Sequence, residues 1–173
     1  MSVRMRPLAA VACLSAAGCA LLSPLGDLRT PADRAREVSP LCKSVREDDM
    51  AVLLSPSSVD TVQPAYATVP SGPAEREARL QGVRIRLRPT PGMSSETLTR
   101  SIECHQARVT LGELVPDADD PYVLPGVWLD LDASSARDSF VIVVGADDIE
   151  DARLVLERAR RFMARSAAPA ATP

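Results

Sequence analysis

The stretch Gly82-Val83-Arg84-Ile85-Arg86-Leu87-Arg88 alternates between apolar or small residues and arginines. Because successive side chains of a β-strand point to opposite faces, this pattern predicts a strand with one buried apolar face and one face of arginines. Pro89 and Pro91 end the strand, since proline donates no hydrogen bond to a sheet. We therefore expect the ordered core to begin at Gly82.

A helix, two strands and a second helix are predicted downstream. Ser94 or Ser95 can cap the first helix, which runs to about Leu111 and is ended by Gly112. Alternating residues at 127–132 predict a half-buried strand, and a polar turn over 134–138 leads into the apolar run 140–144, which is typical of a central strand. An apolar stripe at helical spacing predicts the last helix, with Ile149, Ala152, Leu156, Ala159 and Met163 on one side.

The predicted order of elements is βαββα, and the fold class is α+β. A right-handed crossover between the first two strands and a hairpin between the last two favour a three-stranded sheet in the order 1-3-2. Both helices then lie on one face of the sheet. The chain has 173 residues, which is enough for one small domain with flanking segments.

Composition limits the chemistry that this chain can perform. It has 1 histidine, so a Ser-His-Asp hydrolase or a site with several histidine ligands is not expected. The 20 basic and 23 acidic residues form no basic cluster interleaved with aromatic residues, which argues against a nucleic-acid partner. We therefore expect that the protein is not an enzyme, and that it has no catalytic residues, no cofactor and no metal site.

The N-terminus has the features of an export signal. Arg4 and Arg6 precede the apolar segment 8–17, which is too short to span a membrane. The run Ser15-Ala16-Ala17-Gly18-Cys19 resembles the lipobox of bacterial lipoproteins, although Ala16 stands where leucine is commonest. The resemblance implies cleavage before Cys19, acylation of its thiol with palmitate-type chains, and anchoring in the outer membrane, facing the periplasm. An ordinary signal peptide cleaved near Ala20, which would leave a soluble protein, is the alternative.

The chain is therefore expected to divide into five parts. These are a signal peptide (1–18), a lipidated tether (19–40), an irregular or helical segment that packs on the core (41–81), the βαββα domain (82–165) and a disordered tail (166–173).

Two cysteines remain if Cys13 leaves with the signal and Cys19 is acylated. In an oxidising compartment Cys42 and Cys104 are expected to form a disulfide. The alternatives are two unrelated thiols, or a metal site in which both cysteines join His105. His105 itself is expected in the core, bonded to a backbone carbonyl or a loop carboxylate.

Two further motifs are weaker signals. The segment 101–105 ends in Cys104-His105, as a haem attachment motif does, but it has a serine in place of the first cysteine. The loop with Asp117, Asp119 and Asp120 resembles part of a calcium loop, yet it lacks the expected glycine and the bidentate glutamate. A solvated turn is the favoured interpretation of this loop.

The exposed sheet face is the candidate binding surface. In the predicted strand order, valines run down the middle of this face. One side carries Arg84, Arg86 and Arg88, and the opposite side carries Trp128, Asp130 and Asp132. This face could bind another envelope protein or a second copy of the chain, unless residues 41–73 cover it. The sequence therefore predicts a lipid-anchored envelope protein with a non-catalytic binding or structural role. A periplasmic module that binds a small ligand or a metal is the alternative.

Overall fold

A computed structural model describes residues 29–72 and 75–167. The predicted signal peptide and the predicted acylation site Cys19 lie outside the described residues. Of the tail predicted for residues 166–173, the first two residues instead belong to the last helix, and the others lie outside the described residues. In chain order the elements are helix α1 (Pro31–Val38), 3₁₀ helix η1 (Ser39–Ser44), helix α2 (Glu47–Leu53), 3₁₀ helix η2 (Pro56–Ser58), strands β1 (Val59–Pro70) and β2 (Arg76–Leu87), helix α3 (Ser95–Thr110), strands β3 (Asp130–Ala136) and β4 (Ser139–Gly145), and helix α4 (Ile149–Ala167).

The mixed α+β class is confirmed, but the predicted three-stranded sheet in the order 1-3-2 is wrong. Within the described residues the sheet is antiparallel and has four strands in the order β1-β2-β4-β3. The extra strand, β1, lies in a segment whose prolines suggested irregular structure. Pro64 and Pro70 are compatible with a strand there because β1 is at the edge of the sheet, where an amide hydrogen can be missing.

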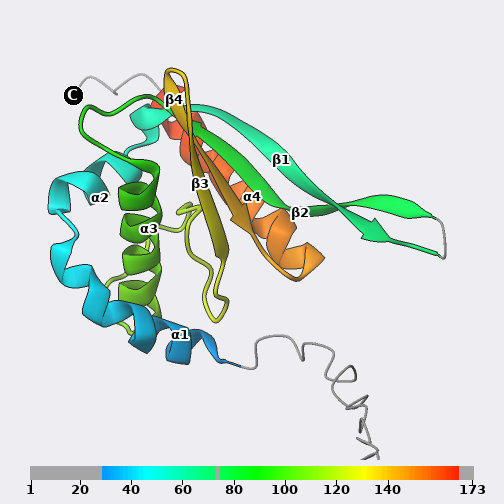
Figure 1. The fold of residues 1–173 in the computed structure, drawn as a ribbon, viewed down its shortest axis with the longest axis horizontal. Helices are drawn as coiled ribbons and strands as arrows, with labels where there is room; N and C mark the ends of the chain where they lie inside the picture. Colours follow the sequence, from blue (N-terminus) through cyan, green and yellow to red (C-terminus); the bar gives the residue numbers. More distant parts are fainter. Residues whose placement is uncertain (1–28, 73–74, 168–173) are drawn as a thin grey trace, which may run out of the picture.

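One face of the sheet, the inner face, packs against the helices (Figure 1). Alternate residues of β2 and β4 are buried on it, as the period-two pattern predicted. Helices α3 and α4 send side chains into the same core. Its members include Val83, Ile85 and Leu87 of β2, Phe140, Ile142 and Val144 of β4, Leu98 and Ile102 of α3, and Ala152, Val155 and Phe162 of α4. Each large side chain buried in this way stabilises the fold by roughly 1.5–3 kcal/mol.

The segment before β1 packs beside α3. The Thr30 hydroxyl accepts a hydrogen bond from the Asp33 amide, and the Asp33 carboxylate accepts one from the Thr30 amide, so a capping box starts α1. The tether predicted for residues 19–40 therefore does not extend past Thr30. Helices α1, η1 and α2 all contact α3 (Figure 1). Residues 41–58 thus complete the helical layer.

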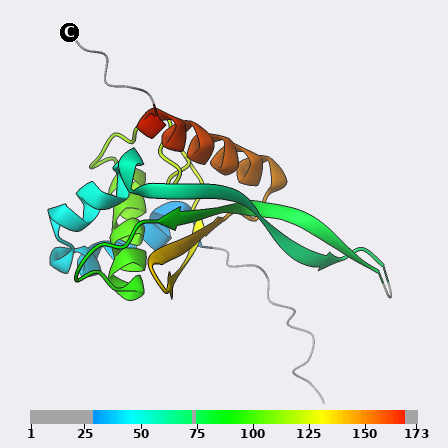
Figure 2. The same ribbon diagram turned by 90° about the horizontal axis from the view of Figure 1, so that it is seen from above.

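Strands β1 and β2 continue beyond the rest of the sheet as a two-stranded arm. Strand β4 pairs with β2 only over 82–87, whereas residues 76–80 pair with β1 alone. The arm therefore projects away from the helices (Figure 2). The arm leaves the sheet at Gly82. The pairing of β1 with β2 is irregular at this point, since Ala65 pairs with Gly82 but the next residue, Tyr66, pairs with Leu80. Strand β2 thus begins at Arg76, and the ordered domain already begins with α1 at Pro31, so the start at Gly82 expected from the sequence is wrong.

Candidate binding face

The sheet face away from the helices is the best candidate for a functional surface. Strand register places its side chains in two rows that cross all four strands. One row contains Gln63, Arg84, Val143 and Asp132, and the next contains Thr61, Arg86, Val141 and Ser134. These eight residues, which we call the outer face, line a shallow hollow of about 480 Å³.

Charge on the outer face is not neutralised locally. Arg84 and Arg86 are exposed, while their neighbours Val83, Ile85 and Leu87 are almost completely buried. Among the described residues, neither guanidinium forms an ion pair with a carboxylate, and Asp132 has no cationic partner. Two cations and an anion therefore flank two half-buried valines on an open surface.

Three of the six predicted surface residues belong to this face, and three do not line its hollow. Arg88 follows the end of β2, and its amide donates a hydrogen bond to the Ser58 carbonyl at 2.9 Å. Trp128 precedes β3 and is half-buried. Asp130 is at the start of β3, and its carboxylate lies 3.5 Å from the Arg34 guanidinium of α1. Only Arg84, Arg86 and Asp132 are brought together as expected.

Sequence reasoning missed Thr61, Gln63 and Ser134. The first two belong to β1, in a segment interpreted as irregular or as short strands rather than as a full strand of the sheet, and Ser134 was placed in a turn. A signal for β1 was present, since Val62 and Pro64 point to one face and Thr61 and Gln63 to the other. The four prolines of residues 55–73 masked that alternation.

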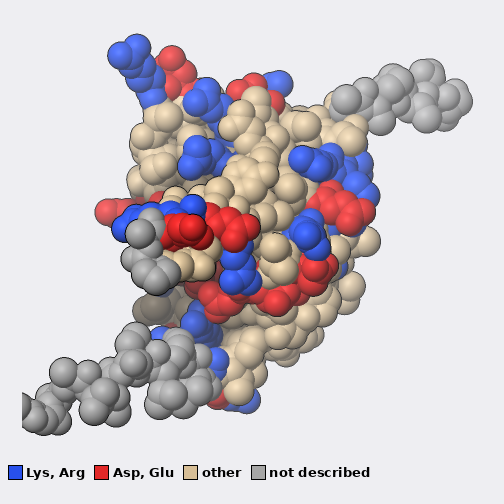
Figure 3. Space-filling view, turned by 90° about the vertical axis from the view of Figure 1, so that its right-hand side faces the viewer, with Lys and Arg blue, Asp and Glu red and all other residues tan. Residues whose placement is uncertain are grey.

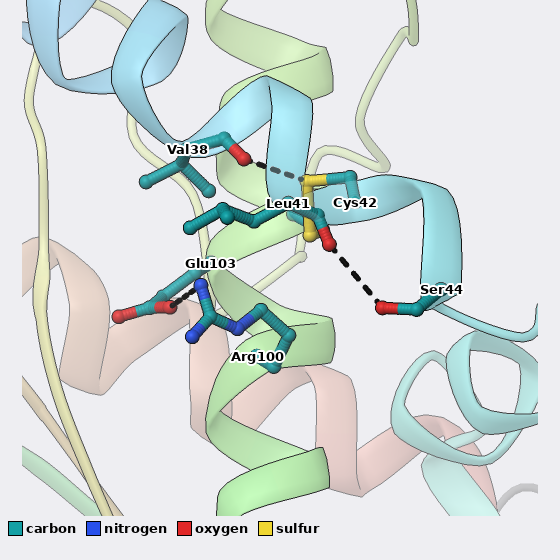
Figure 4. Close-up of a disulfide and its surroundings, with 7 residues drawn as sticks. Val38, Leu41, Cys42, Ser44, Arg100 and Glu103 are labelled. Carbon is teal, nitrogen blue, oxygen red and sulfur yellow. Dashed lines mark hydrogen bonds and ion pairs between the residues drawn. A yellow bond between two sulfur atoms is a disulfide. The ribbon is translucent and has the colours of Figure 1, made fainter.

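The predicted disulfide between Cys42 and Cys104 is confirmed, with a Cα–Cα distance of 5.4 Å. It joins η1 to α3 near Arg100 and Glu103 of that helix (Figure 4). Because the two sulfurs are bonded to each other, neither is a free thiolate that could coordinate a metal together with His105. No cluster of three or more histidine, cysteine or acidic side chains suited to a metal occurs in residues 29–72 and 75–167.

His105 is bonded to a loop carboxylate, as expected. Its Nε2 lies 2.6 Å from Asp120 Oδ2, and both side chains are buried. The other Asp120 oxygen accepts a hydrogen bond from the Tyr122 amide at 2.9 Å. Burial, together with the charge of Asp120, raises the pKa of the Tyr122 hydroxyl. The histidine therefore holds the 117–122 loop against α3.

The other acidic residues of the loop bind arginines of α4. The Asp117 carboxylate lies 2.5 Å from Arg165, and the Asp119 carboxylate lies 2.6 Å from Arg161. The hydrogen bond from Arg165 lowers the pKa of Asp117, and the bond to Asp119 raises the pKa of Arg161. We call Asp117, Asp119 and Asp120 the loop clamp, since their carboxylates tie the loop to two helices.

A second hollow, of about 540 Å³, lies between the start of α1, the end of α3 and the loop before β3. Apolar side chains predominate in its lining, with Pro31, Val109, Leu124 and Pro125 among them. Its position near α1 could not be foreseen, because α1 falls in the predicted tether. It holds no charged side chain that would select a ligand.

Acidic and basic side chains are interspersed on the side of the molecule seen along the arm, without a large field of one sign (Figure 3). In the part of the chain that the structure describes, no helix is both long and apolar enough to cross a membrane. No family model, curated protein or solved structure matches the chain.

Proposed function

We propose that this chain is a lipid-anchored protein of the cell envelope, held in the outer membrane through acylated Cys19, and that it acts on the periplasmic side by binding rather than by catalysis. The observation that supports binding is the outer face. Guanidinium groups and a carboxylate without local partners, beside half-buried valines on a sheet surface, are suited to a partner with complementary charge.

The disulfide supports export. Disulfides persist in oxidising compartments such as the bacterial periplasm and are rare in the cytosol. The bond between Cys42 and Cys104 joins two segments that are 62 residues apart in the chain, so it contributes to the stability of the whole domain.

The side chains that catalysis could use have structural roles. His105 and Asp120 are buried against each other, and the other acidic residues of the loop clamp bind arginines. Neither His105 nor Asp120 lines the hollow of the outer face or the hollow beside α1. A binding role therefore agrees better with the placement of these groups than a hydrolytic one.

Lipidation is tested by labelling cells with a palmitate analogue. The chain is expected to carry the label and to sediment with membranes, and Cys19→Ala should remove the label and release the protein. Cys13→Ala is the matched control and should keep both the label and the membrane association. An unlabelled, soluble parent chain would contradict anchoring.

Binding by the outer face is tested by site-specific photocrosslinking in intact cells. A photoreactive amino acid at position 134, on the outer face, is expected to give protein adducts, and one at position 160, on the exposed side of α4, is not. Arg84→Glu together with Arg86→Glu should abolish the adducts without changing the urea midpoint, because both residues are exposed. The absence of adducts from position 134 would refute the role of this face.

A further inference from the structure

The charges of the outer face are arranged around a central strand. In one row Val143 of β4 lies between Arg84 of β2 and Asp132 of β3. The cation and the anion thus lie on opposite sides of β4, one strand away from it. A rotation of 180° about an axis parallel to β4 exchanges the positions of these two charges.

We propose that the outer face binds a second copy of this chain, with the two sheets stacked about a two-fold axis parallel to β4. This inference rests on the proposed role of the outer face and names its partner. In this arrangement Arg84 of each copy lies opposite Asp132 of the other, so one contact occurs twice. The valines of the two β4 strands meet at the axis.

The dimensions of a sheet sandwich agree with this arrangement. Face-to-face sheets pack about 10 Å apart with interdigitating side chains. An extended arginine opposite a short aspartate spans such a gap, and facing valines fill its centre. In the second row Arg86 lies opposite Ser134 of the other copy, whose hydroxyl oxygen can accept a hydrogen bond.

The charges select this axis over the alternative two-fold axis that crosses the strands. That axis would stack β2 on β2 and place Arg84 and Arg86 against the same arginines of the second copy. Like charges opposite each other are unfavourable at an interface. Association through the free edge of β1 is also disfavoured, because Pro64 and Pro70 interrupt the donors that an added strand would need.

A charge exchange between two differently tagged copies tests the proposal. The full chain is expressed in both tagged forms, extracted from membranes in detergent and purified through one tag, and recovery of the other tag is measured. Arg84→Asp in both copies should reduce recovery at least tenfold, and so should Asp132→Arg in both copies. One copy with each substitution should restore recovery, because every facing pair again has opposite charges.

Arg160→Asp is the matched control, since it reverses an exposed arginine on α4, and it should leave recovery unchanged. The urea midpoint of each variant verifies that it is folded. The proposal is overturned if the single substitutions leave recovery intact, or if the mixed pair fails to restore it.

The crosslinks from position 134 separate this inference from the proposed function. Adducts with a different protein, and no recovery of the second tag, would refute self-association but leave the outer face as a binding surface. Recovery that persists in both reversed variants, with no adduct from position 134, would refute both proposals.

Discussion

Gly82→Ala should be among the most destabilising single-methyl additions in this domain. Gly82 has φ +155°, in a region that residues with a side chain rarely adopt. A Cβ built there would lie 2.0 Å from the Val144 carbonyl oxygen of β4. Because Gly82 pairs with Gly145 at the last rung of the β2–β4 ladder, the methyl group would push the two strands apart where the arm leaves the sheet.

The size of the effect follows from two contributions. Real Cβ atoms essentially never approach another atom within 3.0 Å, so the strands must separate by about 1 Å. Overpacking of this kind costs about 1–3 kcal/mol, and the unfavourable φ adds about 1–2 kcal/mol. We expect a total loss of about 3 kcal/mol. With a urea dependence of about 2 kcal/mol per molar, the midpoint should fall by about 1.5 M.

Two other glycines separate the contributions. Gly112 has φ +76°, but no atom lies within 4 Å of the position that an added methyl group would take, so Gly112→Ala should cost only about 1 kcal/mol. Gly145 has no positive φ and meets its nearest atoms at 3.8 Å, so Gly145→Ala should cost less than about 1 kcal/mol. Urea unfolding of the oxidised protein, followed by circular dichroism, gives all three values. Equal losses for Gly82→Ala and Gly145→Ala would refute the predicted clash.

Three further predictions concern the disulfide, the loop clamp and the buried pair. Reduction of the disulfide should lower the free energy of unfolding by about 4 kcal/mol, because the unfolded chain gains the entropy of a loop of this length. Urea midpoints with and without dithiothreitol measure this loss. In a variant with both cysteines replaced by serine, dithiothreitol should leave the midpoint unchanged. Because the pKa of Asp117 is lowered in the folded state by Arg165, its contribution to stability is present above the unfolded pKa of about 3.9 and is lost as the pH falls through the folded pKa. Asp117→Asn should therefore reduce the loss of stability between about pH 5 and pH 2.5, and an unchanged pH profile would contradict the clamp. His105→Leu leaves the Asp120 carboxylate buried without its partner and should cost about 3 kcal/mol in urea unfolding, whereas a loss below about 1 kcal/mol would mean that the pair contributes little.

The local patterns of the sequence predicted the central elements well because burial there follows strict periodicity. The alternation of residues 82–88 identified the inner and outer sides of β2, and the apolar run 140–144 identified a strand buried among others. The cap of α3 was also foreseeable, because a serine stands just before the helical pattern. The structure shows that Ser94 is the cap, with its hydroxyl accepting a hydrogen bond from the Thr97 amide at 3.1 Å. Each of these features depends on residues that are close in sequence.

The missing strand and the early helix depend instead on tertiary context. Prolines count against a strand only where the amide must donate to a neighbour, and the edge position that removes this requirement is not visible in the sequence of β1. In the same way, α1 is short and is stabilised by its contacts with α3 and by the nearby disulfide. Composition alone therefore indicated a tether.

The outer face shows why register, rather than residue type, decides a site of this kind. The sequence predicted arginines and aspartates on opposite sides of the valines, but it could not say which residues share a row. The tight turn between Ala136 and Ser139 sets that register, and it places Asp132 beside Val143 and Ser134 beside Val141. A slip of one residue would turn Asp132 toward the core and remove its carboxylate from the hollow. The same turn that closes the hairpin therefore determines whether two copies of the face can match their charges.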